Sequence, residues 1–186
     1  MGYYLNEEEF EIIQFFAESP HEEESLLKEL KKAMGKFERW CSYNGTAFDE
    51  PFIVRKMNRF NLGFRLPSEH IDLFRIIRPF YKRMGIKSCS LKSVEQFTGI
   101  KRQDEINGAK WVELYNKYLI KHDEKLTEIL MLHNYEDVVN LPKIFEVINT
   151  IENDLEIKRK EKLDKKSLLN NNRNTNPPLK TVNSQL

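Results

Sequence analysis

Residues 40–52 read WCSYNGTAFDEPF and combine the signals of a strand, a tight turn and a helix. The first four residues predict a short strand, Asn44-Gly45 is a strong turn signal, and the following helix tolerates Pro51 in its first turn. Asp49 stands at the start of that helix. In an open α/β sheet this position lies in the crevice beside the carboxyl end of a strand, where ligands bind. Simple capping of the helix by Asp49 is the alternative.

The aromatic residues beside Asp49 complete this interpretation. We expect Phe48 and Phe52 to anchor the turn in the core, so that Asp49 points outward. Asp49 then offers its carboxylate to a ligand at the sheet edge.

A second segment, residues 133–139, places an imidazole and a carboxylate on one face of a helix. His133 and Asp137 are four residues apart, so on a helix they act at the same point in space. Such a pair can hold a hard metal ion and handle a proton. An exposed His–Asp pair without a function is the alternative.

The rest of the chain alternates between strand and helix patterns, which predicts an α/β fold. An aromatic and β-branched run at residues 10–16 predicts a buried strand, and the helical pattern of residues 125–157 is broken by Pro142. The polar, asparagine-rich end of the chain predicts a disordered C-terminal tail. We therefore expect a domain over residues 1–157 and a tail over 158–186.

Composition excludes several classes of protein. The 186 residues contain no apolar run near the ~20 residues of a membrane span, and the start lacks a signal-peptide pattern. Two cysteines exclude a disulfide scaffold and a zinc ribbon, and they fit a reducing cytoplasm. We expect a cytoplasmic protein with no membrane partner.

The net charge of +1 hides a strongly uneven distribution. Residues 52–92 contain ten Lys or Arg against two acidic residues, whereas residues 1–50 contain five against twelve. A basic middle in a neutral chain favours a local anionic partner. The alternative is that these cations face solvent or pair with the acidic first third.

Taken together, the two segments resemble a known family. Tyr-Asn-Gly-x-x-Phe-Asp ending at Asp49, Ser-Leu-x-x-x-Glu at residues 90–95 and His-Asn-x-x-Asp ending at Asp137 stand in the order found in YprB-type predicted 3′–5′ exonucleases. These are ribonuclease H-like members of the DEDD superfamily. The resemblance covers roughly residues 2–150.

The resemblance implies hydrolysis of nucleic-acid phosphodiesters at two Mg²⁺ or Mn²⁺ ions about 4 Å apart. It makes Asp49 and Asp137 catalytic metal ligands and His133 the residue that positions or deprotonates the attacking water. Asp72 matches a supporting acid. The implied partner is a single-stranded DNA or RNA end, with the basic stretch following its phosphates. The residues expected to contact nucleic acid are Asn44, Gly45, Arg55 and Arg102.

One element of the family pattern is missing. No Asp-x-Glu pair precedes Asp49, and Asp154-Leu155-Glu156 has the spacing in the wrong order. We therefore expect an N-terminally incomplete sheet and a metal site that lacks half of its ligands. The missing strand is either encoded before a start that is assigned too late or supplied by another chain. The alternative functions are a catalytically inactive nucleic-acid-binding or adaptor domain and a decayed fragment without activity.

Overall fold

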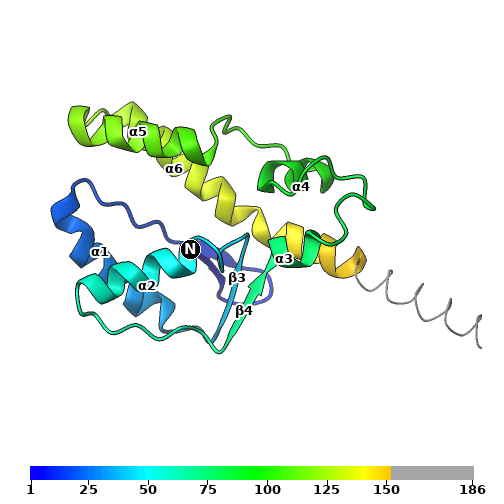
Figure 1. Ribbon diagram of the computed structural model, residues 1–186, viewed down its shortest axis with the longest axis horizontal. Helices are drawn as coiled ribbons and strands as arrows, with labels where there is room; N and C mark the ends of the chain where they lie inside the picture. Colours follow the sequence, from blue (N-terminus) through cyan, green and yellow to red (C-terminus); the bar gives the residue numbers. More distant parts are fainter. Residues whose placement is uncertain (152–186) are drawn as a thin grey trace, which may run out of the picture. The chain divides into compact units, whose positions relative to one another are not determined.

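The computed structural model describes residues 1–151, of which residues 1–145 form one compact unit (Figure 1). Strands and helices alternate along this unit, so the predicted α/β class is confirmed. The predicted domain boundary after residue 157 and the predicted tail lie outside the described residues. No helix in the described part is long and apolar enough to cross a membrane.

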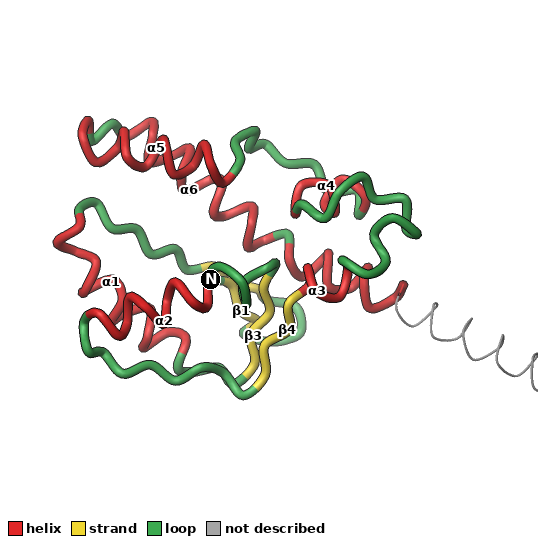
Figure 2. Tube along the Cα trace, in the orientation of Figure 1, coloured by secondary structure: helices red, strands yellow, loops and turns green. Residues whose placement is uncertain are grey.

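The first two strands, β1 (Gly2–Tyr4) and β2 (Phe10–Ile12), form an antiparallel hairpin that is separate from the other strands (Figure 2). The predicted buried strand over residues 10–16 is wrong, because the ladder ends at Ile12 and no residue of this range is buried. Among the described residues β2 pairs only with β1, so no second strand covers it. The rest of the aromatic run packs on a helix instead, with the Phe16 ring 5.1 Å from that of Tyr118.

The next two strands create the edge that carries the candidate site. β3 (Arg39–Ser42) and β4 (Glu69–Asp72) are parallel, and Ser42 lies opposite Asp72. Parallel neighbours require a crossover connection, which here contains the helix α2 (Asp49–Arg59). The carboxyl ends of β3 and β4 therefore meet at one edge, as the sequence pattern predicts.

The first long helices are tied together by charged side chains. A short 3-10 helix, η1 (Pro20–Glu22), leads into α1 (Glu23–Met34). Glu23 of α1 forms ion pairs with Lys56 and Arg59 of α2.

The buried apolar side chains of residues 1–145 are Leu27, Met57, Leu73, Ile77, Ile86, Val94, Tyr118, Leu130 and Ile144.

Two short helices follow β4. α3 (Leu73–Ile77) starts directly after the strand, with Asp72 as its N-cap. α4 (Leu91–Phe97) begins after Ser90, whose hydroxyl accepts a hydrogen bond from the amide of Ser93, a standard N-cap contact. Gly99 adopts a φ of +77° just beyond α4, a left-handed conformation that glycine adopts without strain and that commonly follows the end of a helix.

The last two helices, α5 (Gly108–Lys121) and α6 (Glu124–Val139), lie side by side (Figure 1). Trp111 stacks on Tyr115 with ring centroids 5.4 Å apart, and its indole Nε1 donates to the Leu130 carbonyl at 3.2 Å. These aromatic residues of α5 therefore pack against α6 and do not form a surface for stacking bases. α6 ends before Asn140 and residues 141–151 resume a helix, in agreement with the break predicted at Pro142.

Candidate functional site

The turn after β3 is held by a single carboxylate. Asp72 Oδ1 accepts the Asn44 amide at 2.7 Å, and Oδ2 accepts the Thr46 amide at 3.1 Å and the Thr46 hydroxyl at 2.6 Å. Burial alone would raise the pKa of Asp72, but the hydrogen bonds from Thr46, Asn44 and Phe74 outweigh it and hold the pKa below its usual value. Asp72 is fully engaged in supporting the turn.

The conformation of the turn explains why asparagine stands at position 44 and glycine at position 45. Asn44 adopts a φ of 61°, a left-handed conformation that asparagine tolerates better than most residues. Gly45 is buried, and a Cβ built on it would lie 2.4 Å from Ser42 Oγ and 3.3 Å from Asp49 Oδ2. Their backbone places Asp49 close to the end of β3. Their predicted contact with nucleic acid remains a prediction.

Asp49 is the first residue of α2, where its charge lies beside the positive end of the helix dipole. The N-cap position is taken by Phe48, so Asp49 is not the capping residue, but its place in the first turn agrees with the alternative that it stabilises the helix. Although the residue is exposed, partial burial of its carboxyl raises the pKa of Asp49, and the charges of Asp137 and Asp72 raise it further. Asp49 and Asp137, which are remote in the sequence, thus lie within electrostatic reach of each other.

The phenylalanines beside Asp49 do not anchor the core, so that expectation is wrong. Phe48 is 67% exposed and Phe52 is 50% exposed. The reason is the phase of α2, which turns Met57 into the core and leaves residues 48, 52 and 55 on the opposite, solvent-facing side. The Arg55 guanidinium lies 5.5 Å from the Phe52 ring centroid. An exposed aromatic and basic surface therefore adjoins Asp49.

The second predicted segment lies on α6, and His133 and Asp137 do share one face. His133 Nε2 lies 3.5 Å from Asp137 Oδ2. The imidazole is buried, whereas the Asp137 side chain keeps 37% of its surface exposed. The carboxylate is thus accessible while the imidazole behind it is enclosed.

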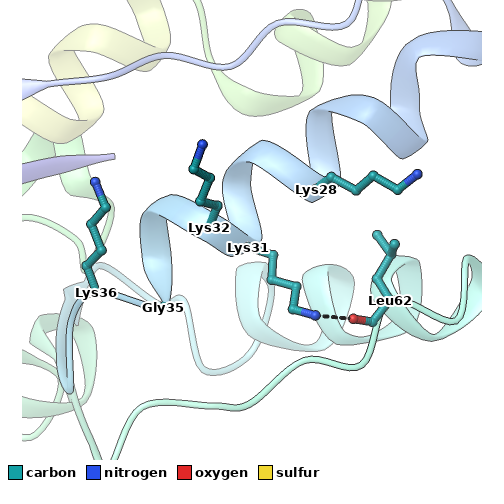
Figure 3. A pocket seen from close by; sticks show the side chains of 6 residues that line it. All are labelled: Lys28, Lys31, Lys32, Gly35, Lys36 and Leu62. Carbon is teal, nitrogen blue, oxygen red and sulfur yellow. Dashed lines mark hydrogen bonds between the residues drawn. The ribbon is translucent and has the colours of Figure 1, made fainter.

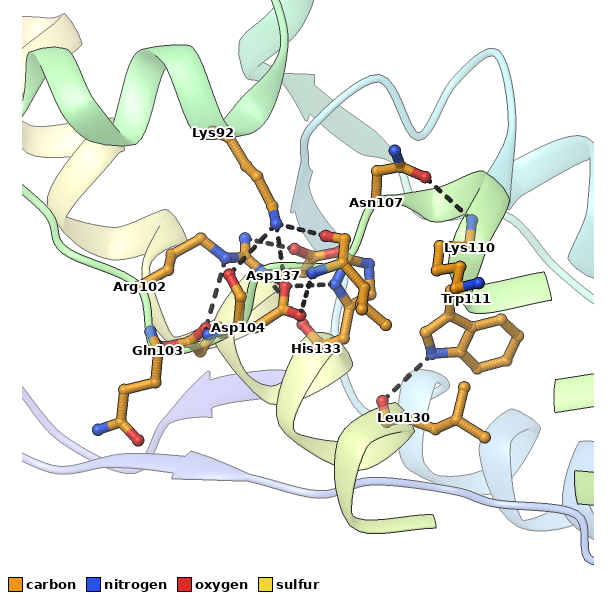
Figure 4. A network of polar contacts seen from close by, with 12 residues as sticks. Lys92, Arg102, Gln103, Asp104, Asn107, Lys110, Trp111, Leu130, His133 and Asp137 are labelled. Carbon is orange, nitrogen blue, oxygen red and sulfur yellow. Dashed lines mark hydrogen bonds and ion pairs between the residues drawn. The ribbon is translucent and has the colours of Figure 1, made fainter. Parts of the chain in front are cut away.

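Arg102 occupies the centre of a buried polar network (Figure 4). Its side chain is 6% exposed, and Nη1 contacts Asp137 Oδ1 at 2.6 Å and Glu95 Oε1 at 3.0 Å. Nη2 contacts Asp104 Oδ2 at 3.1 Å, and Nε lies 3.4 Å from Glu136 Oε2 without a hydrogen bond. Arg102 was expected to contact nucleic acid, but here its donors point to carboxylates of the protein.

Two carboxylates of this network, Asp104 and Glu136, were not identified from the sequence, whereas Glu95 ends the Ser-Leu-x-x-x-Glu motif but was given no role. Asp104 contacts His133, Glu136 accepts the amides of Gln103 and Asp104, and Glu95 accepts the side-chain amide of Asn140 at 2.9 Å. Glu136 carries a readable signal, because it lies three residues after His133 on the same helix. Asp104 stands in a loop, where no periodicity marks it.

Most cations of the basic stretch form no ion pair with the described residues. Eight of the ten are exposed, and only Lys56, Arg59 and Lys92 of this stretch form ion pairs within residues 1–151. Pairing with the acidic first third is limited to the contacts of Glu23 with α2. Most of these cations therefore remain available to an external anion.

A surface depression of about 460 Å³ lies along α1 and is lined by four lysines, Gly35 and Leu62 (Figure 3). The lysine side chains point in different directions, Lys28 pairs with Glu24, and Lys31 donates to the Leu62 carbonyl. Because these ammonium groups do not converge, the depression does not have the geometry of an anion site.

The comparison with known families agrees with this architecture. A family model described as the RNase H superfamily matches residues 1–149. The chain belongs to the RNase H superfamily. No curated protein and no solved structure gives a match.

Nucleases of this superfamily generally use divalent metals, and the acidic pair fits part of such a site. Asp49 and Asp137 supply hard oxygen donors whose mutual repulsion a cation would relieve. Mg²⁺ is commonly held by one or two carboxylates together with waters and substrate phosphates. However, residues 1–151 contain no group of three or more His, Cys, Asp or Glu side chains that could hold a metal ion. The described residues thus supply two carboxylates and not a complete metal site.

Proposed function

We propose that this chain is a metal-dependent 3′–5′ exonuclease-like domain that acts on single-stranded DNA or RNA. The proposal rests on one observation: in a chain of the RNase H superfamily, Asp49 follows the turn at the carboxyl end of β3, and Asp137 of α6 is near enough for its charge to act on that carboxyl. A bound Mg²⁺ or Mn²⁺ would supply Lewis acidity and an activated water there.

The ligand count implies that this site needs further acidic residues. Two ions require several carboxylates at one place, and the described residues provide only Asp49 and Asp137 at this position. We propose that the remaining ligands, an Asp-x-Glu pair in YprB-type relatives, come from a polypeptide segment other than these residues. That segment would complete the sheet beside β3 and β4.

The substrate surface is proposed to lie on the exposed side of α2. Phe48 and Phe52 present aromatic faces on which bases can stack, and Arg55 adds a positive charge beside them. Asp49 lies between the two phenylalanines in the sequence. A strand stacked on these rings would bring its phosphates close to the acidic pair.

A second candidate is a nucleic-acid-binding domain without catalysis. The incomplete set of metal ligands favours it, together with the exposed and unpaired cations of the basic stretch. This function requires salt-dependent binding but no divalent metal.

The two candidates are separated by assaying 5′-labelled single-stranded DNA and RNA with Mg²⁺, with Mn²⁺ and with a chelator. The exonuclease predicts metal-dependent shortening that falls at least about 100-fold in both Asp49→Asn and Asp137→Asn, because each removes a charged oxygen ligand. Asp123→Asn, which changes the same charge at the start of α6, is the matched control and should retain activity. Binding without shortening, by the chain supplied with an Asp-x-Glu strand, selects the second candidate. Neither binding nor shortening at low salt would overturn both.

A further inference from the structure

The buried carboxylate of Asp104 makes the closest polar contact with the imidazole of His133. His133 Nδ1 lies 2.6 Å from Asp104 Oδ2, and both residues are buried (Figure 4). Asp104 reaches α6 from the loop between α4 and α5. The contact therefore fixes the orientation of the ring from outside its own helix.

The surroundings of Asp104 decide which atom carries the proton of this hydrogen bond. Arg102 Nη2 lies 3.1 Å and Lys92 Nζ lies 3.3 Å from Asp104 Oδ2, and the Ile106 amide donates to Oδ1 at 2.8 Å. Burial alone would raise the pKa of Asp104, but the hydrogen bonds from His133, the Ile106 amide and Lys92 hold it below its usual value. An ionised carboxylate only accepts hydrogen bonds, so Nδ1 of His133 is the donor.

The opposite nitrogen is then the atom that faces the acidic site. His133 Nε2 lies 3.5 Å from Asp137 Oδ2, which is beyond a good hydrogen bond. In the neutral ring with a proton on Nδ1, Nε2 keeps a free lone pair on the side of Asp137. This is the arrangement that a general base needs to accept a proton from water.

Arg102 links the two carboxylates that border the ring. Its guanidinium bonds to Asp104 through Nη2 and to Asp137 through Nη1, and Nη2 also donates to the His133 carbonyl at 3.2 Å. A planar guanidinium fixes the relative placement of the groups that it bridges. Asp104, the imidazole and Asp137 are thereby held as one unit.

We propose that Asp104 is a positioning residue that holds His133 in the Nδ1–H tautomer, so that the unprotonated Nε2 lies on the side of Asp137. The role of His133 as a base rests on the proposed function, whereas its tautomer does not. The experiment is therefore chosen to read the tautomer first and activity second.

The tautomer is read from long-range ¹H–¹⁵N spectra of the labelled 186-residue chain at about pH 9, where an ordinary imidazole is neutral. His133→Gln assigns the signals among the four histidines. We expect His133 to carry its proton on Nδ1. In Asp104→Asn the side-chain amide can donate to Nδ1, so we expect the proton to move to Nε2.

Asp123→Asn is the matched control, because it changes the same charge at the other end of α6 and should leave the His133 signals unchanged. A wild-type His133 protonated on Nε2 would overturn the proposal without recourse to any variant. An unchanged tautomer in a folded Asp104→Asn would overturn it as well.

Activity adds a second readout that separates this proposal from the proposed function. Where the chain shortens single strands, Asp104→Asn should lower kcat by about 10²–10⁴-fold and leave KM nearly unchanged, as expected for a wrong tautomer. A loss confined to KM would contradict the positioning role. If the chain supplied with an Asp-x-Glu strand cleaves nothing, the proposed nuclease fails, while the tautomer measurement still decides the role of Asp104.

Discussion

At Gly45 the turn approaches β3 so closely that no side chain fits. An added Cβ would lie 2.4 Å from Ser42 Oγ and 2.6 Å from Ser42 Cβ. We therefore expect Gly45→Ala to lower the free energy of unfolding by about 1–3 kcal/mol, the usual cost of overpacking. Urea denaturation followed by circular dichroism measures this change.

Gly108 provides the matched control, because an added Cβ at this position meets no atom within 4 Å. It is the first residue of α5, where alanine favours the helix more than glycine does. Gly108→Ala should leave stability equal or slightly higher. Equal losses in both variants would show that the contact with Ser42 is not the cause.

We expect the ionised carboxylate of Asp49 to lower the free energy of unfolding at neutral pH. Its pKa is raised by partial burial and by Asp137 and Asp72, so the folded state binds this proton more tightly than the unfolded chain does. Asp49→Asn should therefore raise the free energy of unfolding at pH 7, by up to about 1 kcal/mol for this exposed residue. The gain should shrink as the pH falls through the folded pKa and the wild-type carboxyl is neutralised.

Asp137→Asn provides the contrast, because this carboxylate is the 2.6 Å partner of the buried Arg102. Its neutralisation weakens the compensation of a buried cation and should lower stability. Chemical denaturation of both variants at pH 4 and at pH 7 checks the opposite signs. Loss of stability in Asp49→Asn at pH 7 would contradict the electrostatic account.

The sequence reveals those site residues whose roles follow from local spacing, and it misses those whose roles arise from tertiary contacts. The spacing of His133 and Asp137 places both on one face of a helix, and the structure confirms it. The exposure of Phe48 was missed because the sequence does not say which side of the following helix packs on the core. An apolar residue beside the turn can therefore face either the core or solvent. Asp104 was missed because its role arises only when the loop folds against α6.

At the scale of elements, Glu136 joins the loop before α5 to helix α6. Its two carboxylate oxygens accept the amides of Gln103 at 2.8 Å and Asp104 at 2.9 Å. Glu136→Ala leaves these amides without their acceptor and leaves Arg102 with one negative neighbour fewer. We expect a loss of about 2–4 kcal/mol in the free energy of unfolding.

Amide hydrogen exchange shows which residues lose protection in Glu136→Ala. In Glu136→Ala the amides of Gln103 and Asp104 should exchange much faster than in the wild type, since their acceptor is gone. The matched control is Glu128→Ala, which truncates an exposed glutamate of the same helix. Unchanged protection of the two loop amides in Glu136→Ala would contradict the anchoring role of this residue.

Helices were predicted more reliably than strands for a physical reason. The helical period of residues 91–97 and 125–139 lies within the segments themselves, together with their capping residues. The run at residues 10–16 has strand-forming residues, but its length as a strand depends on the neighbours it finds. In the described part its only partner strand is β1, which spans three residues, so the ladder stops early.

At the scale of the whole molecule, the uneven charge of the chain survives folding. In the basic stretch, the exposed cations that form no ion pair within residues 1–151 are Arg55, Arg65, Arg75, Arg78, Lys82, Arg83 and Lys87. Ion pairs with the acidic first third would have made these cations contribute to the stability of the fold. Because they face solvent instead, their charges are available to bind a polyanion.

Arg55 gives the sharpest test of this surface, because it lies beside an exposed ring on the helix that begins with Asp49. Arg55→Ala should weaken binding of a fluorescent single-stranded oligonucleotide about 3–10-fold, and it should reduce the slope of log K against log salt by about 0.7, the value for one phosphate contact. Phe52→Ala should weaken binding by about 1–3 kcal/mol with an unchanged salt slope, because stacking releases no counterion. Lys28→Ala is the control of equal charge, since Lys28 is an exposed lysine of α1 paired with Glu24. If Lys28→Ala weakens binding as much as Arg55→Ala does, the oligonucleotide is held by diffuse surface charge and not by the exposed side of α2.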